Sequence, residues 1–90
     1  MAKRIGADKA RTTDTLGESL GAEITRLRLA KGLSQVKFAE LLGYDERYIR
    51  QLERGSKSPT LRTLTHLAEA FGIPVSTLLK KAERRLTVRS

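Results

Sequence analysis

The sequence predicts an all-α fold, a compact five-helix bundle formed by one small domain. The first observation is that apolar residues recur every three or four positions in five successive segments, which is the spacing of one helical face. The second is that glycines and helix-capping residues separate these segments. The third is that no segment shows the strict alternation of a strand. Ninety residues suffice for one core of this kind.

The chain begins with a polar, basic stretch, residues 1–15, which has no apolar periodicity and is expected to be a flexible arm. Such an arm either stays solvated or reaches DNA, and the sequence leaves both uses open. The first helix follows, with Thr15 or Ser19 as its candidate cap, and we expect it to end near Lys31, before Gly32. Its apolar face is formed by Leu20, Ile24 and Leu27.

Two short helices joined by a tight turn are predicted over residues 34–55. Ser34 is a good N-cap for a helix over residues 35–42, because its hydroxyl can accept from a free backbone N–H. Gly43 suits the left-handed residue that ends this helix. The apolar positions that face inward are Phe38, Ala39 and Leu42.

The second helix of the pair is predicted over residues 45–54, with Asp45 as its cap and Gly55 at its end. Ile49 and Leu52 form its apolar side. The opposite side carries the polar and charged residues Glu46, Arg47, Arg50, Gln51 and Arg54. A short helix with this composition matches a reader of the major groove, since Arg can bond guanine, Gln adenine and Glu cytosine.

Two more helices are expected after this pair. Ser58 or Thr60 caps the first of them, Gly72 ends it, and its apolar stripe is Leu61, Leu64, Leu67, Ala68 and Phe71. The fifth helix starts near Pro74, and its apolar side is Val75, Leu78 and Leu79. The basic C-terminal extension, residues 81–90, either prolongs this helix or frays.

Most of the net charge of +8 lies at the two ends of the chain, outside the domain expected over residues 16–80. Residues 1–15 hold four basic and two acidic groups, and residues 81–90 hold four basic and one acidic. A small basic protein favours a polyanionic partner, with nucleic acid first. Because the middle of the chain is nearly balanced, its binding must depend on where the charges lie.

Several function classes are not expected from this composition. The chain has no cysteine and a single histidine, so neither a disulfide scaffold nor a metal or cofactor site is expected. It lacks a His–Cys or Ser–His–Asp set and a phosphate loop, so we do not expect an enzyme. No apolar run approaches the roughly 20 residues that cross a bilayer. No secretory signal is present, and a cytoplasmic location without a membrane partner is expected.

The paired helices resemble the helix-turn-helix of the Cro and phage-repressor family, the XRE-type regulators. The resemblance spans about residues 20–79 and is carried by Gly32-Leu-Ser-Gln35, Ala39, Gly43, Ile49, Leu52-Glu-Arg-Gly55 and Pro59-Thr-Leu61. It implies the lambda-repressor-like DNA-binding bundle as the fold. In length the chain is also similar to the small controller proteins of restriction–modification systems.

The resemblance implies that the helix over residues 45–54 enters the major groove. The positions that would read bases are Glu46, Arg47, Arg50 and Gln51. It also implies a phosphate contact by Gln35 at a helix N-terminus, and a structural ion pair between Arg28 and Glu53. Further candidate phosphate contacts are Lys37, Tyr48, Ser56, Lys57, Ser58, Thr60 and Arg62.

The expected partners are double-stranded DNA and a second copy of the chain, because regulators of this type bind inverted repeats as homodimers. The candidate dimer residues lie on and after the fifth helix: Val75, Leu78, Leu79, Leu86 and Val88. Leu78 could instead complete the core of the monomer. The alternative function is a protein-interaction module, since the same fold occurs in antitoxins and coactivator-like proteins. A protein partner would then use the C-terminal helix.

Overall fold

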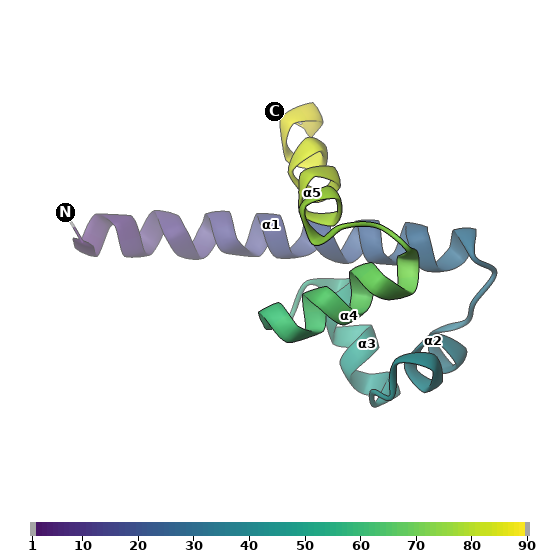
Figure 1. The fold of residues 1–90 in the computed structure, drawn as a ribbon. Helices are drawn as coiled ribbons and strands as arrows, with labels where there is room; N and C mark the ends of the chain where they lie inside the picture. The colour runs from purple at the N-terminus through teal and green to yellow at the C-terminus, as the bar shows by residue number, and fades with distance from the viewer. Residues whose placement is uncertain (1, 90) are drawn as a thin grey trace.

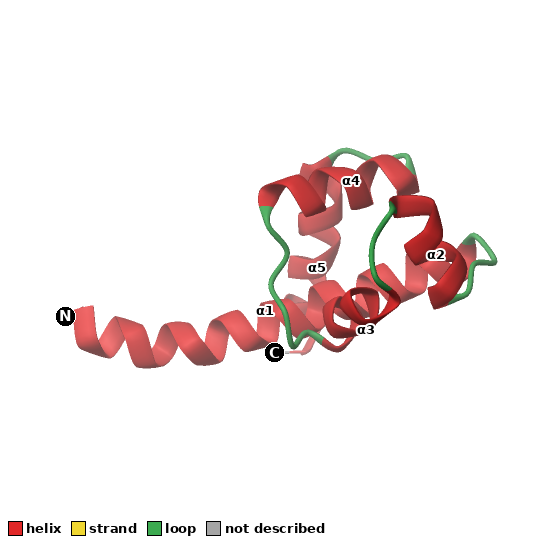
Figure 2. Ribbon diagram, turned by 90° about the horizontal axis from the view of Figure 1, so that it is seen from below, coloured by secondary structure: helices red, strands yellow, loops and turns green. Residues whose placement is uncertain are grey.

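The computed structural model contains five helices and, among the residues it describes, no strand (Figure 1 and Figure 2). It describes the backbone of residues 2–89 and the side chains of residues 16–86. The helices are α1 (Ala2–Ala30), α2 (Gln35–Leu42), α3 (Glu46–Arg54), α4 (Leu61–Phe71) and α5 (Val75–Arg89). The predicted all-α, five-helix fold is therefore confirmed.

The long helix α1 is the element on which the others assemble. It packs mainly against α5 and α3. Figure 1 shows α2, α3 and α4 gathered on one side of its C-terminal half, while α5 crosses it. The N-terminal half of α1 extends beyond the other four helices (Figure 2). The position of α3 is thus set largely by the C-terminal half of α1.

The start of α1 differs from the prediction. Thr15 and Ser19, the two candidate caps, lie inside the helix, and residues 2–15 continue it. No proline interrupts this stretch, and its alanines, lysines and arginines favour a helix. The capping-box pattern at Thr15 therefore marks no boundary. The side chains of residues 1–15 lie outside the described part of the chain, so the expected contact of this arm with DNA stays a prediction.

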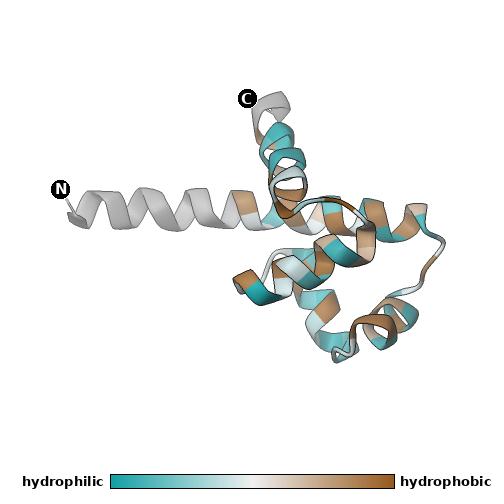
Figure 3. Cartoon of the chain, in the orientation of Figure 1, coloured by the Kyte–Doolittle hydropathy of each residue, from teal (hydrophilic) through white to brown (hydrophobic). Residues whose placement is uncertain are grey.

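The core draws on every helix. Figure 3 shows apolar residues on each of the five helices. The residues that bury in one cluster are Leu20, Ile24, Phe38, Ala39, Ile49, Leu52, Leu64, Leu67, Ala68, Phe71, Leu78 and Ala82. Phe38 and Phe71 stack with their ring centroids 5.3 Å apart, which joins α2 to α4.

The boundaries of α4 and α5 settle two predictions that the sequence left open. The cap of α4 is Thr60, whose Oγ1 accepts from the backbone N–H of Thr63 at 3.1 Å. Gly72 ends α4 in the left-handed conformation, with φ of 72°. The basic C-terminal segment prolongs α5 as far as Arg89. Within the described residues no helix combines the length and the apolar character that crossing a bilayer requires.

Candidate nucleic-acid interface

Local capping fixes the two helices of the predicted motif. Ser34 Oγ accepts from the N–H of Lys37 at 3.1 Å and caps α2. Gly43 ends α2 with φ of 77°. Asp45 caps α3 by accepting from the N–H of Arg47 at 2.7 Å. The predicted helix–turn–helix geometry of residues 34–55 is therefore confirmed, with Asp45 as the cap and α3 beginning at Glu46.

The inner side of α3 fixes which of its residues face outward. Ile49 and Leu52 are buried in the core. The predicted base-reading residues lie away from this apolar side, with Arg47 exposed and the other three half-buried: Glu46, Arg50 and Gln51. We call these four residues the recognition face. Burial of one side of a nine-residue helix thus presents the predicted readers together.

One ion pair lies within the recognition face. Arg50 Nη1 donates to Glu46 Oε2 at 2.6 Å, which joins two residues four positions apart on the helix. The side chains are 42% and 40% exposed, so solvent screens the pair and it adds little to stability. It does restrict where the Arg50 guanidinium lies.

The predicted structural ion pair between Arg28 and Glu53 is formed. Arg28 Nε donates to Glu53 Oε2 at 2.6 Å, and Arg28 Nη2 donates to Oε1 at 3.1 Å. Both side chains are less than one tenth exposed. A third donor, Nη1, reaches the carbonyl oxygen of Leu33 at 2.7 Å. The bidentate pair connects α1 to the end of α3, and the third bond adds the loop before α2.

Gln35 joins this buried arrangement. Its Nε2 donates to Glu53 Oε1 at 2.9 Å, so one amide hydrogen points toward the protein rather than outward. The side chain lies at the first position of α2, where the backbone N–H groups of the helix end favour an anion. The predicted phosphate contact of Gln35 stays a prediction, with its amide oriented by Glu53.

Two of the predicted phosphate contacts are occupied within the protein. Tyr48 OH donates to Thr63 Oγ1 at 3.3 Å, and its ring meets that of Tyr44 edge-on, 5.5 Å between centroids. Thr60 Oγ1 donates to Thr63 Oγ1 at 3.2 Å besides capping α4. Tyr44 OH also lies 2.6 Å from Nδ1 of His66, which is half-buried. This polar cluster ties the start of α3 to α4, and no local signal in the sequence indicated it.

The remaining candidate phosphate contacts are exposed: Lys37, Ser56, Lys57, Ser58 and Arg62. Lys37 Nζ lies 3.7 Å from a carboxylate oxygen of Glu40, and both side chains are mostly exposed. Ser56 Oγ donates to the carbonyl oxygen of Gln51 at 3.3 Å, which closes the end of α3. The structure thus places these residues on solvent-facing positions of α2, of the loop after α3 and of α4.

The structure corrects one predicted dimer residue. Leu78 is 0% exposed and fills the core, so its side chain offers no surface to a partner. Val75 and Leu79 are half-buried and pack against the core cluster. Leu86 is half-buried as well, and the side chain of Val88 lies outside the described residues.

A buried carboxylate that the sequence analysis missed connects α1 to α5. Glu23 is 4% exposed, and its Oε2 accepts from Arg26 Nη2 at 2.6 Å. Its Oε1 accepts from Arg85 Nε at 3.0 Å, across 62 positions of the sequence. The hydrogen bond from Arg26 is the main cause that lowers the pKa of Glu23, and burial opposes it only in part. The pair with Arg85 helps to fix α5 on α1.

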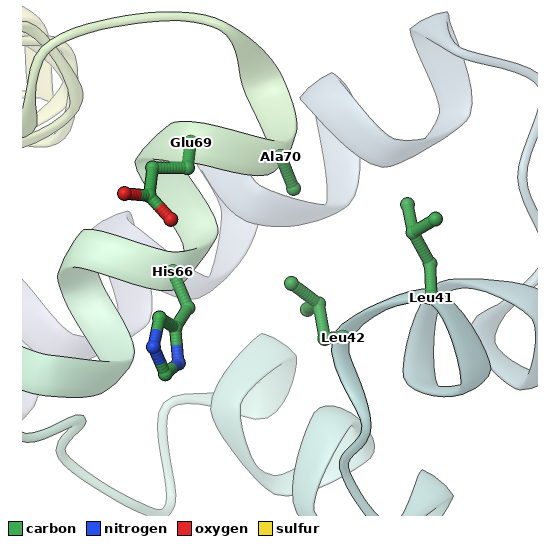
Figure 4. A pocket seen from close by; sticks show the side chains of 5 residues that line it. All are labelled: Leu41, Leu42, His66, Glu69 and Ala70. Carbon is green, nitrogen blue, oxygen red and sulfur yellow. The ribbon is translucent and has the colours of Figure 1, made fainter.

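A shallow pocket lies between α2 and α4, apart from the recognition face. Its volume is about 480 Å³, and Figure 4 shows its lining: Leu41, Leu42, His66, Glu69 and Ala70. None of the predicted DNA-contacting residues lines it. Within residues 16–86 no three side chains of the metal-binding types gather closely enough to hold an ion.

Comparison with known proteins agrees with this geometry. A helix-turn-helix family model matches residues 24–78, which include α2, α3 and α4 in full. Among proteins of similar sequence, an uncharacterized HTH-type transcriptional regulator, y4dJ of Sinorhizobium fredii, is 41% identical over 54 residues, which are 60% of this chain and 70% of y4dJ. The chain spans a smaller share of other relatives, such as 37% of the regulator SutR of Escherichia coli.

Two solved structures are similar as well. The clp gene regulator ClgR of Corynebacterium glutamicum matches with a TM-score of 0.76 and 30% identity, over 82% of this chain and 79% of ClgR. The restriction-modification controller protein C.AhdI of Aeromonas hydrophila matches with a TM-score of 0.64 and 38% identity, over 68% of this chain and 92% of C.AhdI.

Proposed function

The chain belongs to the helix-turn-helix family of DNA-binding transcriptional regulators, and we propose that it binds an inverted-repeat operator in double-stranded DNA as a homodimer. Members of this family are regulators and not enzymes. The observation that supports sequence-specific binding most strongly is the recognition face, where one Glu, two Arg and one Gln share the outer side of α3. These are the side chains that can distinguish base edges in the major groove.

In the proposed complex α2 crosses the DNA backbone and the N-terminal part of α3 enters the major groove. The N-terminus of α2, with Gln35, faces a phosphate. Further phosphate contacts come from Lys37 and Arg62 and from the exposed loop Ser56-Lys57-Ser58. The hydroxyl groups of Tyr48 and Thr60 are additional candidate phosphate contacts. The basic segments 1–15 and 81–90 add attraction that does not depend on sequence.

The proposed dimer forms through α5. One helix-turn-helix covers only a few base pairs, so two copies are needed to read an operator, with half-sites about 34–36 Å apart or a multiple of that distance. Val75 and Leu79 are the described apolar residues of α5 that keep partial exposure near its start, and Leu86 lies two turns further on.

Selection from a pool of random-sequence DNA tests the proposal. We expect the protein to enrich an inverted repeat whose half-sites lie about one helical turn apart. Retention of DNA with a steep salt dependence but no enriched motif would contradict sequence-specific binding, and would indicate that the basic ends dominate. A protein partner at α5 would then be the better candidate, as in the antitoxin-like or coactivator-like alternative.

Sedimentation at micromolar concentration tests the dimer separately. We expect a dimer in solution, or two copies bound on one operator duplex. Leu79→Lys should weaken this association while the melting temperature shows whether the core survives. A protein that is monomeric in solution and also binds DNA one copy at a time would refute the dimer. It would leave the proposed base contacts of α3 unaffected.

A further inference from the structure

We infer that Glu46 is a positioning residue for Arg50, and that the two side chains together select one guanine in each half-site. This inference rests on the proposed function and refines it, because Glu46 then reads no base of its own. The starting observation is the hydrogen bond of 2.6 Å from Arg50 Nη1 to Glu46 Oε2 within the recognition face.

The contact leaves the useful edge of the guanidinium available. An arginine can bond a two-acceptor partner side-on, through Nε and Nη2 together. Glu46 engages Nη1, and no hydrogen bond among the described residues occupies Nε or Nη2 of Arg50. Guanine presents O6 and N7 side by side in the major groove, which matches two parallel donors.

The same protein shows this edge in use on another partner. Arg28 binds both carboxylate oxygens of Glu53 through its Nε and Nη2, at 2.6 and 3.1 Å. In Arg28 the side-on edge is therefore occupied inside the core, whereas in Arg50 it is available on the outer side of α3. The two arginines differ in which edge of the guanidinium the glutamate engages. This difference suits Arg28 for a structural role and Arg50 for a contact with a base.

Stability does not explain the pair between Glu46 and Arg50. Both side chains are about two fifths exposed, where ion pairs contribute little. Holding the guanidinium in place before binding, in contrast, reduces the conformational entropy that Arg50 loses on the DNA. The carboxylate also repels phosphates, which lowers the affinity for DNA of any sequence, so net binding depends more on the bond between Arg50 and guanine. Arg47, which is exposed and in no ion pair among the described residues, lacks such a partner.

Selection on random-sequence DNA with five proteins tests the inference: the unmodified chain, Arg50→Ala, Glu46→Ala, Glu46→Gln and the double variant Glu46→Ala/Arg50→Ala. The unmodified protein should prefer guanine at one half-site position by roughly tenfold to 100-fold, and Arg50→Ala should abolish that preference. Glu46→Ala should weaken the preference at the same position by about twofold to tenfold. The double variant should match Arg50→Ala, because Glu46 acts through Arg50.

Glu46→Gln separates positioning from charge. Its amide oxygen still accepts from Arg50, so most of the guanine preference should remain. Its lost negative charge should raise affinity for random DNA by roughly twofold to fivefold. Melting temperatures within a few degrees of the unmodified protein would show that every variant is folded, as expected for half-exposed residues.

Two results would overturn this inference and leave the proposed function standing. In one, Glu46→Ala alters the preference at a different base pair from Arg50→Ala, which would make Glu46 a reader in its own right. In the other, the enriched motif is the same with and without Glu46. If the unmodified protein enriches no motif, the proposed function fails and the inference fails with it.

Discussion

Replacing Gly21 with alanine tests how closely α1 packs on the end of the recognition helix. A Cβ at this position would lie 2.3 Å from the carbonyl oxygen of Glu53 and 2.6 Å from that of Leu52. Both oxygens belong to the backbone of α3, so no side-chain rotation relieves the contact. Ordinary contact begins at 3.4 Å, and the two helices must therefore separate by roughly 1 Å.

This separation should destabilise the protein. Overpacking of this kind costs about 1–3 kcal/mol, and the better helix propensity of alanine offsets at most about 1 kcal/mol. The shift also strains the buried pair of Arg28 with Glu53, which joins the same two helices. With the full offset we expect a net loss of up to about 2 kcal/mol, which lowers the melting temperature by up to roughly 15 °C in a domain of this size.

The assay is thermal unfolding followed by far-UV circular dichroism, with Gly17→Ala as the matched control. A Cβ at Gly17 would lie 3.4 Å from the carbonyl oxygen of Gly55, which is ordinary contact. Gly17→Ala should therefore leave stability unchanged or raise it by up to about 1 kcal/mol. If Gly21→Ala melts as high as Gly17→Ala, the close approach of α1 to α3 is wrong.

Three further predictions concern buried polar groups. Arg28→Ala leaves the Glu53 carboxylate buried without its arginine, so chemical denaturation should show a loss of about 3–5 kcal/mol, and a loss below about 1 kcal/mol would mean that water replaces the arginine. Ser19→Ala should raise stability by up to about 1 kcal/mol, because Ser19 Oγ is buried with no hydrogen-bond partner among the described residues; a clear loss of stability would show that this hydroxyl does form a hydrogen bond. The pKa of Glu23 is lowered in the folded protein, so its contribution to stability is present above the ordinary glutamate pKa and is lost as the pH falls through the lowered value. Glu23→Gln should reduce the loss of folding free energy at acidic pH. An unchanged dependence of stability on pH would contradict the lowered pKa of Glu23.

The motif itself could be predicted from the sequence because it depends on local chemistry. Ser34 and Asp45 cap helices whose free N–H groups lie within three residues, and Gly43 and Gly55 adopt positive φ at the positions where a helix must end. The start of α1 could not be found in the same way. A capping pattern at Thr15 is equally compatible with a helix that continues through it.

The features that the sequence could not show depend on contacts between distant segments. The pair of Glu23 with Arg85 spans 62 positions, and the close approach at Gly21 depends on where the end of α3 lies. Leu78 was a candidate for both the core and a dimer surface, since its spacing fits either. Only the packing of α5 on α1 assigns it to the core.

If α3 reads bases, Arg47→Ala should lower the ratio of the affinity for the operator to the affinity for random DNA. Binding of this variant and of Lys57→Ala would be measured on the enriched operator and on random DNA at several salt concentrations. We predict that Arg47→Ala loses about 1–3 kcal/mol on the operator and relaxes the preference at one base pair. Lys57→Ala should weaken binding to both DNAs alike and lower the salt dependence. An equal loss of affinity for both DNAs in Arg47→Ala would contradict base reading by α3, because Arg47 would then contact phosphate instead of a base.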